Sequence, residues 1–313
     1  MSRVAERKKK RGRWWKVPLI VFSLLILAGG VYAFTLYNGA KATVDQKMNK
    51  EVASIDHELT EKKVKQNEPL NILLLGVDER NGDRGRSDAL MVMTLDPNDD
   101  RSQIVSIPRD TRTEMVGNSR HNGSLDKINH AYAFGGTDMS IQTVENFLDI
   151  ELDYYVKMNM EGLAEMVDAV GGVTVQNDLD WVGKNGYHYK KGELNLNGAE
   201  TLMYVRMRYE DPRGDAGRNE RQRQVIQQVL DKGANFASVN KIHDMLDVLG
   251  NNVTTNMDFS VMKDLMVNYS SARKDLKTYQ MTGNGTRIGG IYYLQVPDQE
   301  VQKVQGLINE YSS

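Results

Sequence analysis

Arginine is concentrated in one short segment of this chain of 313 residues. Residues 203–224 contain six arginines, namely Arg206, Arg208, Arg213, Arg218, Arg221 and Arg223. A guanidinium group binds phosphate oxygens through two parallel hydrogen bonds, so a cluster made of arginine alone suits a pyrophosphate group. The same segment also contains four acidic residues, Glu210, Asp211, Asp215 and Glu220. Ion pairs between these residues are the other interpretation, and the residue types alone do not choose between the two.

Two aspartates are placed where a metal ion could bind. Asp78 follows the apolar run 70–75, and Asp88 comes just before the next apolar run, 89–95, with Arg86 two residues earlier. In an open α/β sheet, ligands bind in the loops at the ends of strands. Mg²⁺ takes one or two carboxylates together with phosphate oxygens and water. The pair indicates either a magnesium site or a solvated acidic loop, because other charged residues surround both aspartates.

The local pattern around the arginines predicts how they are presented. At the start of the segment apolar residues alternate with Arg206 and Arg208, so an extended strand would project both arginines from one side. A helix is expected to begin near Arg218, and Arg218, Arg221 and Gln222 would share the face of its first turn. Cations at a helix start oppose the helix dipole. Their presence there needs a further reason, such as a bound polyphosphate or the nearby acids.

Strands and helices alternate along the part of the chain that carries these residues. Apolar runs predict strands at 70–75, 89–95, 104–107, 153–158, 173–176, 277–281 and 291–295. Helical periodicity occurs at 138–148, 160–170, 219–232, 241–249 and 260–270. Arg109 comes two residues after the third of these strands. Such an alternation predicts a layered α/β domain.

Charge is distributed unevenly along the chain. Residues 1–16 contain eight basic residues and one acidic residue, which leaves 32 basic and 41 acidic residues in the rest, although the whole chain has a net charge of only −2. This near-neutral total, without a helix-turn-helix pattern, argues against nucleic acid as a partner. The sequence contains no cysteine, which excludes thiol nucleophiles, disulfides and cysteine-ligated metal sites.

An uncharged stretch follows the basic block. Residues 17–36 carry no charge, and about 20 residues of helix reach about 30 Å, the thickness of the hydrocarbon core of a bilayer. The basic block places the N-terminus in the cytoplasm. We expect a cytoplasmic tail at 1–16 and an uncleaved transmembrane anchor at 17–37. A cleaved signal peptide is the alternative, because Val31-Tyr32-Ala33 is an acceptable cleavage site.

The segment between the anchor and the first strand is mostly polar. In 38–68 the sparse apolar residues recur at intervals of three and four, which predicts a modestly amphipathic helix that ends before Pro69. The residues of this pattern are Val44, Met48, Val52, Ile55 and Leu59. We interpret 38–68 as an extracellular stalk and 69–313 as an extracellular catalytic domain.

Eight short motifs occur in the order in which a known protein family carries them. They are LGVD at 75–78, RSD at 86–88, VSIPRD at 105–110, KINHA at 127–131, VGGV at 170–173, LNG at 196–198, YVRMR at 204–208 and RxxRQ at 218–222. Through these motifs the chain resembles the LytR-CpsA-Psr family, and within it the teichoic acid transferases of Bacillus-like bacteria. The resemblance and the alternating pattern predict a layered α-β-α domain with a central mixed sheet, preceded by a single N-terminal transmembrane helix.

The resemblance implies an activity and a role for each site residue. Members of the family are extracytoplasmic phosphotransferases that move an anionic glycopolymer, here wall teichoic acid, from an undecaprenyl-pyrophosphate carrier to the muramic acid of peptidoglycan. By resemblance, Asp78 and Asp88 bind Mg²⁺, for which Mn²⁺ can substitute. The pyrophosphate is bound by Arg86, Arg109, Lys127, Arg206, Arg208, Arg218, Arg221 and Gln222, of which Arg109, Arg206 and Arg208 are also catalytic. The implied location is the cell membrane of a Gram-positive bacterium, as a single-pass type II protein with its C-terminal domain outside.

Two alternative functions remain open, one that requires the same site residues and one that does not. A hydrolase that cleaves the lipid pyrophosphate with water needs the same Mg²⁺ and arginines, so the sequence does not exclude it. A wall-binding or regulatory module without catalysis needs neither. The predicted partners are the polyprenyl-pyrophosphate-linked glycopolymer, peptidoglycan and, through the N-terminal helix, the membrane.

Overall fold

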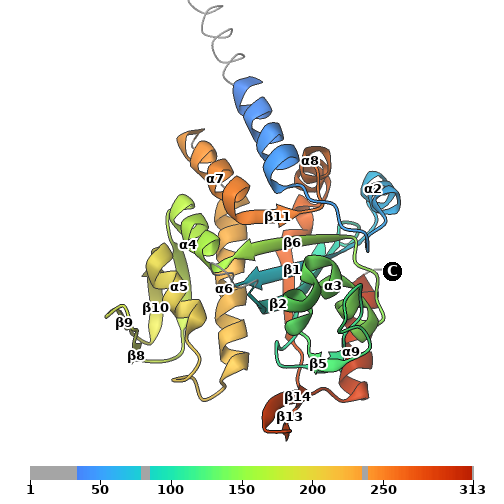
Figure 1. Ribbon diagram of the computed structural model, residues 1–313. Helices are drawn as coiled ribbons and strands as arrows, with labels where there is room; N and C mark the ends of the chain where they lie inside the picture. The colour runs from blue at the N-terminus through green and yellow to red at the C-terminus, as the bar shows by residue number, and fades with distance from the viewer. Residues whose placement is uncertain (1–33, 79–84, 235–238, 312–313) are drawn as a thin grey trace, which may run out of the picture. The chain divides into compact units, whose positions relative to one another are not determined.

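The computed structural model (Figure 1) describes residues 34–78, 85–234 and 239–311. The chain divides into two compact units, Met1–Ala42 and Thr43–Ser313, and the second carries all the described strands. Of the predicted anchor at 17–37, residues 17–33 lie outside the described part, and residues 34–42 are helical. Within the described residues, no helix is both long enough and apolar enough to cross a bilayer.

Six strands form the central sheet of the second unit, in the order β11-β6-β1-β2-β3-β12. In chain order they are β1 (Leu70–Val77), β2 (Ser87–Asp96), β3 (Arg101–Ser106), β6 (Tyr154–Asn159), β11 (Val253–Thr255) and β12 (Asp275–Gln280). β1, β2 and β3 are antiparallel neighbours, whereas β6 runs parallel to β1 and β12 runs parallel to β3. The sheet is therefore mixed, as predicted.

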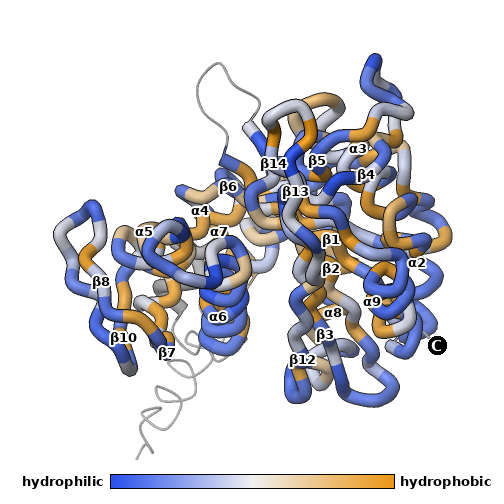
Figure 2. Tube along the Cα trace, turned by 90° about the horizontal axis from the view of Figure 1, so that it is seen from below, coloured by the Kyte–Doolittle hydropathy of each residue, from blue (hydrophilic) through white to orange (hydrophobic). Residues whose placement is uncertain are grey.

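Helices cover both faces of this sheet. Leu73 and Leu75 of β1 pack into a core with α3 (His130–Leu148) and α9 (Asp298–Tyr311), whereas Ile72 packs in a core with α2 (His57–Gln66) and α8 (Phe259–Asn268). Successive strand residues point to opposite faces, so a strand buried on both sides needs an almost continuous apolar run. Figure 2 shows this run as hydrophobic residues concentrated along β1 and β2. The layered α/β prediction is thereby confirmed.

A second hydrophobic core lies outside this sheet. Strand β7 (Val173–Asn177) pairs with β10 (Gly192–Leu196), and both pack with α4 (Met160–Ala169), α5 (Gly198–Arg206) and α6 (Asp215–Ala234). Tyr189 and Tyr204 are almost completely buried in this core. The predicted strand at 173–176 therefore exists but does not belong to the central sheet.

The other described elements are short or peripheral. They are η2 (Thr43–Met48), β4 (Arg112–Glu114), β5 (Leu125–Lys127), β8 (Trp181–Val182), β9 (His188–Tyr189), α7 (Val239–Asn252), η3 (Ser270–Lys274), β13 (Asn284–Ile288) and β14 (Ile291–Gln295). From residue 70 onward, each strand and helix that the apolar runs and the helical periodicity predict is present, with shifted ends.

The prediction of an extended segment around Arg206 is wrong, because helix α5 runs to Arg206. The side chain of Asn197 accepts a hydrogen bond from the backbone of Glu200, and the side chain of Glu200 accepts one from the backbone of Asn197. This capping box fixes the helix start, and its stability outweighs the alternating pattern of the helix's last residues. The chain leaves the helix at Met207, whose backbone is extended.

The segment expected as a stalk instead packs against the domain from Thr43 onward. It forms the π-helical turn η2 and the separate helix α2 rather than one helix. Val44 and Met48 pack in a cluster with Val253 of β11, and Val64 of α2 packs with strand β1. Four of the five apolar residues that suggested an amphipathic stalk, Val44, Met48, Val52 and Ile55, therefore pack against the central domain, whereas Leu59 is exposed.

Replacing Val64 by alanine tests this packing. Val64 is 1% exposed, so we expect the substitution to lower the free energy of unfolding by about 1.5–3 kcal/mol, whereas the control Leu59→Ala, at a 44% exposed residue of the same helix, should change it by less than about 0.5 kcal/mol. Denaturant unfolding measures both variants. A free stalk would leave both unchanged.

Candidate phosphate-binding active site

The ends of β1 and β2 place the two predicted metal ligands in one pocket. The strands pair Val77 with Ser87, so Asp78 and Asp88 each follow a member of this pair. The amide N–H of Asp78 donates to the carbonyl oxygen of Arg86 at 3.3 Å. Both aspartates line a pocket of about 250 Å³, whose other lining residues are Met160, Val205, Arg206, Arg218 and Gln222. The pocket thus draws residues from β2, α4, α5 and α6 and from the loop after β1.

Arg109 reaches the same place from the loop that follows β3. Its Nη1 donates to Oδ1 of Asp88 at 2.7 Å, and its Nε lies 3.8 Å from both Oδ2 of Asp110 and Oδ1 of Asp215. Burial lowers the pKa of Arg109, but the carboxylates of Asp88, Asp215 and Asp110 outweigh it, so the pKa is raised from its ordinary value. Arg109 is therefore a fixed positive charge beside Asp88.

Arg206 and Arg208 approach from the end of α5. Nη2 of Arg206 lies 3.3 Å from Oδ1 of Asp78 and 3.3 Å from Oε1 of Glu161. Nε of Arg208 lies 3.8 Å from Oδ1 of Asp215. The side chains of both arginines are about one-third exposed, at 34% and 30%. Both can therefore meet a ligand that enters from solvent.

Helix α6 contributes the most deeply buried members. Nη2 of Arg218 lies 2.6 Å from Oδ1 of Asp215 and 3.3 Å from the carbonyl oxygen of Asp88. Burial and the nearby guanidinium group of Arg109 lower the pKa of Arg218, although Asp215 and Asp88 raise it. Nε of Arg218 and Oε1 of Gln222 are both buried without a hydrogen-bond partner in the described residues. Buried polar groups without partners are rare, and in a pocket wall they are suited to bind a ligand.

Asp215 links the arginines of the site. This single carboxylate faces Arg109, Arg208 and Arg218 from the first turn of α6. The sequence suggested Asp215 only as one of four acids that could neutralise the cluster. Its spacing of three residues from Arg218 is the signal that could have placed it there. Both interpretations of the cluster thus hold in part: its arginines are paired with acids, and three of them, Arg206, Arg208 and Arg218, also gather with Arg109 around the site.

Arg221 occupies a different position from the other arginines. Its guanidinium group donates to the carbonyl oxygens of Tyr204 and Met207 and to Oδ2 of Asp211, and the residue is 3% exposed. Every nitrogen of this side chain has a protein partner. This placement does not fit the predicted direct contact with pyrophosphate. Arg221 instead fastens the chain between α5 and α6, which carries Arg208.

Two further predicted residues lie near the pocket but do not line it. Nζ of Lys127 lies 2.7 Å from Oδ1 of Asp110 and 5.8 Å from the centre of the Tyr293 ring. Lys127 therefore stabilises the loop after β3, which carries both Arg109 and Asp110. The side chain of Arg86 is exposed. Its backbone carbonyl oxygen accepts a hydrogen bond from the amide of Asp78, which places Arg86 next to the site. The remaining arginines of the segment, Arg213 and Arg223, lie outside the pocket.

The residues of the pocket fit a magnesium ion in the chemistry of their donor atoms. Asp78 and Asp88 offer carboxylate oxygens, and the unpartnered Oε1 of Gln222 is a third hard oxygen. Mg²⁺ is usually bound by one or two carboxylates and completes its shell with water and phosphate oxygens. A closed cage is not present, since the described residues contain no group of three or more His, Cys, Asp or Glu side chains that could hold a metal ion.

The model of the LytR_cpsA_psr family matches residues 32–310 of this chain. The chain belongs to this family. The resemblance carried by the eight motifs is thereby confirmed. The family match covers the whole of the second unit except its last three residues, and so includes every residue of the pocket.

Individual relatives are similar over nearly the whole chain. The polyisoprenyl-teichoic acid–peptidoglycan teichoic acid transferase TagU of Bacillus subtilis is 44% identical over 305 residues, which cover 97% of this chain and 98% of TagU. The crystal structure of B. subtilis TagU has a TM-score of 0.63 at 43% identity and covers 79% of this chain and 97% of that one. The crystal structure of protein gbs0355 from Streptococcus agalactiae has a TM-score of 0.74 at 33% identity and covers 80% and 89%. These relatives include proteins that are named as transferases.

Proposed function

We propose that this member of the LytR-CpsA-Psr family is a phosphotransferase that moves an anionic glycopolymer, wall teichoic acid, from undecaprenyl pyrophosphate to the muramic acid of peptidoglycan. The observation that carries the proposal is the gathering of Arg109, Arg206, Arg208 and Arg218 around the pocket of Asp78 and Asp88. The names of relatives at 41–45% identity support the same donor and acceptor.

The arginines account for the main requirement of phosphoryl transfer, which is to position the phosphates and neutralise their charge. A hydroxyl oxygen of the acceptor sugar attacks the phosphorus that carries the polymer, and the bond from this phosphorus to the bridging oxygen breaks. The polymer is then joined to the acceptor through a phosphodiester, polyprenyl phosphate is the leaving group, and it takes up the proton of the attacking hydroxyl. Arg206 and Arg218 line the pocket, where they bind both phosphates and neutralise their charge. Arg109 and Arg208 border it through Asp88 and Asp215 and hold the departing phosphate.

Asp78 and Asp88 would hold Mg²⁺ in this proposal, with Gln222 beside them, and Mn²⁺ can take its place. When bound, the ion supplies positive charge that favours the departure of the polyprenyl phosphate. The two aspartates also orient the arginines, since Asp88 accepts a hydrogen bond from Arg109 and Asp78 accepts one from Arg206.

The uncharged N-terminal segment 17–37 supports a single-pass type II arrangement in the cell membrane, with the domain outside. Eight basic residues in 1–16 favour the cytoplasmic side for the N-terminus. An anchor of this kind keeps the domain at the membrane in which the lipid carrier lies.

The proposal is tested with the full-length protein, a lipid-linked teichoic acid precursor, Mg²⁺ and peptidoglycan oligomers. We expect polymer joined to glycan, and we expect the Asp78→Ala, Asp88→Ala double variant to lose at least about 100-fold of this activity, because two charged groups of the site are removed. The measurement is the amount of polymer–glycan product over time.

Two outcomes contradict the proposal, one in this assay and one in cells. Free polymer that forms at the same rate with and without acceptor identifies a hydrolase. Normal function of the double variant in cells identifies a wall-binding or regulatory module without catalysis.

A further inference from the structure

A second cavity lies along α6, on the side away from the phosphate pocket. It has a volume of about 650 Å³, and its walls come from β7, β10, α6 and β12. Gln224, Gln227 and Gln228 of α6 line it, whereas Arg218 and Gln222 line the phosphate pocket. At 100° per residue these two sets lie on roughly opposite faces of the helix. We call this cavity the α6 groove.

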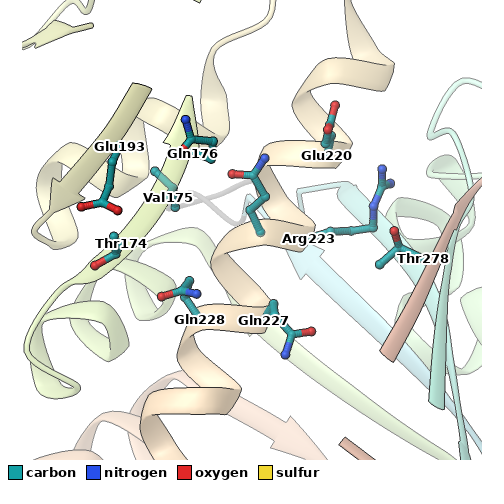
Figure 3. A pocket seen from close by; sticks show the side chains of 10 residues that line it. Thr174, Val175, Gln176, Glu193, Glu220, Arg223, Gln227, Gln228 and Thr278 are labelled. Atoms are coloured by element: carbon teal, nitrogen blue, oxygen red, sulfur yellow. The ribbon is translucent and has the colours of Figure 1, made fainter. Parts of the chain in front are cut away.

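Uncharged hydrogen-bonding groups dominate the α6 groove. Figure 3 shows Gln228 of α6 pointing toward Thr174 of β7, and Arg223 pointing toward Thr278 of β12. The side chains of Gln176 and Gln228 make no hydrogen bond to the described residues of the chain, so their amides are available to a ligand. Amide and hydroxyl groups arranged along a groove complement the hydroxyl and acetamido groups of a saccharide.

The charges of the α6 groove disfavour a polyanion. Glu193 and Glu220 line it together with a single arginine, Arg223. Nη1 of Arg223 already donates to Oγ of Ser106 at 2.8 Å and to Oε1 of Gln280 at 2.9 Å. A chain of phosphodiesters would therefore be repelled by two carboxylates, and the one arginine present already donates hydrogen bonds to other residues. An uncharged glycan meets no such repulsion.

A third cavity has lining residues that contact the linings of both the α6 groove and the phosphate pocket. It has a volume of about 370 Å³, and Arg208, Asp215 and Gln280 are among its lining residues. Asp215 pairs with Arg218 of the phosphate pocket. Two contacts join the linings of this cavity and the α6 groove, namely the ion pair of Arg213 with Glu220 and the hydrogen bond from Arg223 to Gln280. Tyr292 of β14, which is 40% exposed, lines the same cavity and offers a flat apolar face to a sugar ring.

We propose that the α6 groove and the third cavity together seat the acceptor as an uncharged glycan chain, with its reacting hydroxyl at the end near Arg208 and Asp215. The inference rests on the proposed function, because it assigns the acceptor of that reaction to a place on the protein. The lipid-linked polymer then reaches the phosphates from the other side of α6, so donor and acceptor do not compete for the same surface.

Binding of chitohexaose, an uncharged chain of N-acetylglucosamine, to the full-length protein tests the site by titration calorimetry. The Gln176→Ala, Gln228→Ala double variant should raise Kd about tenfold, since two hydrogen-bonding amides are lost. The matched control is Gln302→Ala, at an exposed glutamine of α9, and it should leave Kd unchanged. Equal Kd values for all three proteins, or no binding by the unmodified protein, overturn the inference. If the double variant unfolds early, Gln176→Ala alone is used, because Gln176 is exposed.

A charged competitor and the transfer assay separate this inference from the proposed function. Poly(glycerol phosphate) should not displace chitohexaose, and displacement would overturn the assignment to an uncharged glycan. In the transfer assay the double variant should raise KM for the acceptor about tenfold with kcat unchanged. Transfer with an unchanged KM overturns the acceptor site but not the function. Chitohexaose binding that depends on the two glutamines, without any transfer by the unmodified protein, overturns the function but not the saccharide site.

Discussion

Replacing Arg206 by alanine should lower kcat/KM for polymer transfer by about 10- to 100-fold. Arg206 lines the phosphate pocket, and its Nη2 lies 3.3 Å from Asp78. A hydrogen bond from a charged donor contributes about 1.5–3 kcal/mol, and each 1.4 kcal/mol changes a rate about tenfold. Initial rates with the lipid-linked precursor and a glycan acceptor measure the effect.

Two comparisons show whether the loss comes from the phosphate contact. Arg206→Lys retains the charge but not the paired nitrogens, so its rate should fall between those of Arg206→Ala and the unmodified protein. Arg273→Ala removes an exposed arginine of η3, outside the pocket, and should keep full activity. Because the side chain of Arg206 is about one-third exposed, the free energy of unfolding should change little. Unchanged kcat/KM in Arg206→Ala would exclude the residue from the reaction.

Replacing Arg221 by alanine should lower the free energy of unfolding by about 3–5 kcal/mol, because it leaves the buried carboxylate of Asp211 without its partner. The side chains of Arg221 and Asp211 are 4% and 0% exposed, and they lie 2.6 Å apart. Gly217 makes room for this pair, since a Cβ atom there would lie 1.8 Å from Oδ2 of Asp211. Denaturant unfolding of the folded domain measures the loss.

Arg213→Ala is the matched control, because Arg213 contacts the same aspartate from a side chain that is 44% exposed. We expect it to lower the free energy of unfolding by no more than about 1 kcal/mol. Similar losses in the two arginine variants would contradict the structural role of Arg221.

The pH dependence of the Arg221→Ala variant gives a second check. Burial raises the pKa of Asp211, but hydrogen bonds from Arg221 and Arg213 outweigh it and hold the pKa below its ordinary value. A lowered folded-state pKa stabilises the protein above the ordinary pKa, and this stabilisation is lost as the pH falls through the folded-state value. The difference in unfolding free energy between the unmodified protein and Arg221→Ala should therefore be largest at neutral pH. It should shrink below about pH 4.

Local sequence patterns predicted most elements of the fold, because those elements are buried on one or both faces. The apolar run at 70–75 is explained by strand β1, which has helices on both sides. One of the two places where the prediction failed depends on competition between local signals. At 203–206 a capping box that begins at Asn197 determines a helix, although the last residues alternate as a strand would.

The candidate site was found in part from residue type and position. Asp78 and Asp88 at strand ends and Arg206 and Arg218 were identified from the sequence, and the structure brings all four to one pocket. Sequence did not distinguish Arg221 from Arg218, since both lie on the first turns of one helix. Arg218 faces Asp88 across the pocket, whereas Arg221 points at the carbonyl oxygens of Tyr204 and Met207.

The sequence was sufficient for the family, the alternation of strands and helices, and the kinds of side chain that could bind a pyrophosphate. These follow from short-range patterns, in which spacing along the chain decides the face on which a residue lies. Only the tertiary structure decided which charges meet. Asp215 joins Arg109 to Arg208 and Arg218, although Arg109 lies more than 90 residues earlier in the chain. The packing of residues 43–66 against the domain and the presence of the α6 groove were likewise decided by the tertiary structure. Both depend on contacts between segments that are far apart in the chain.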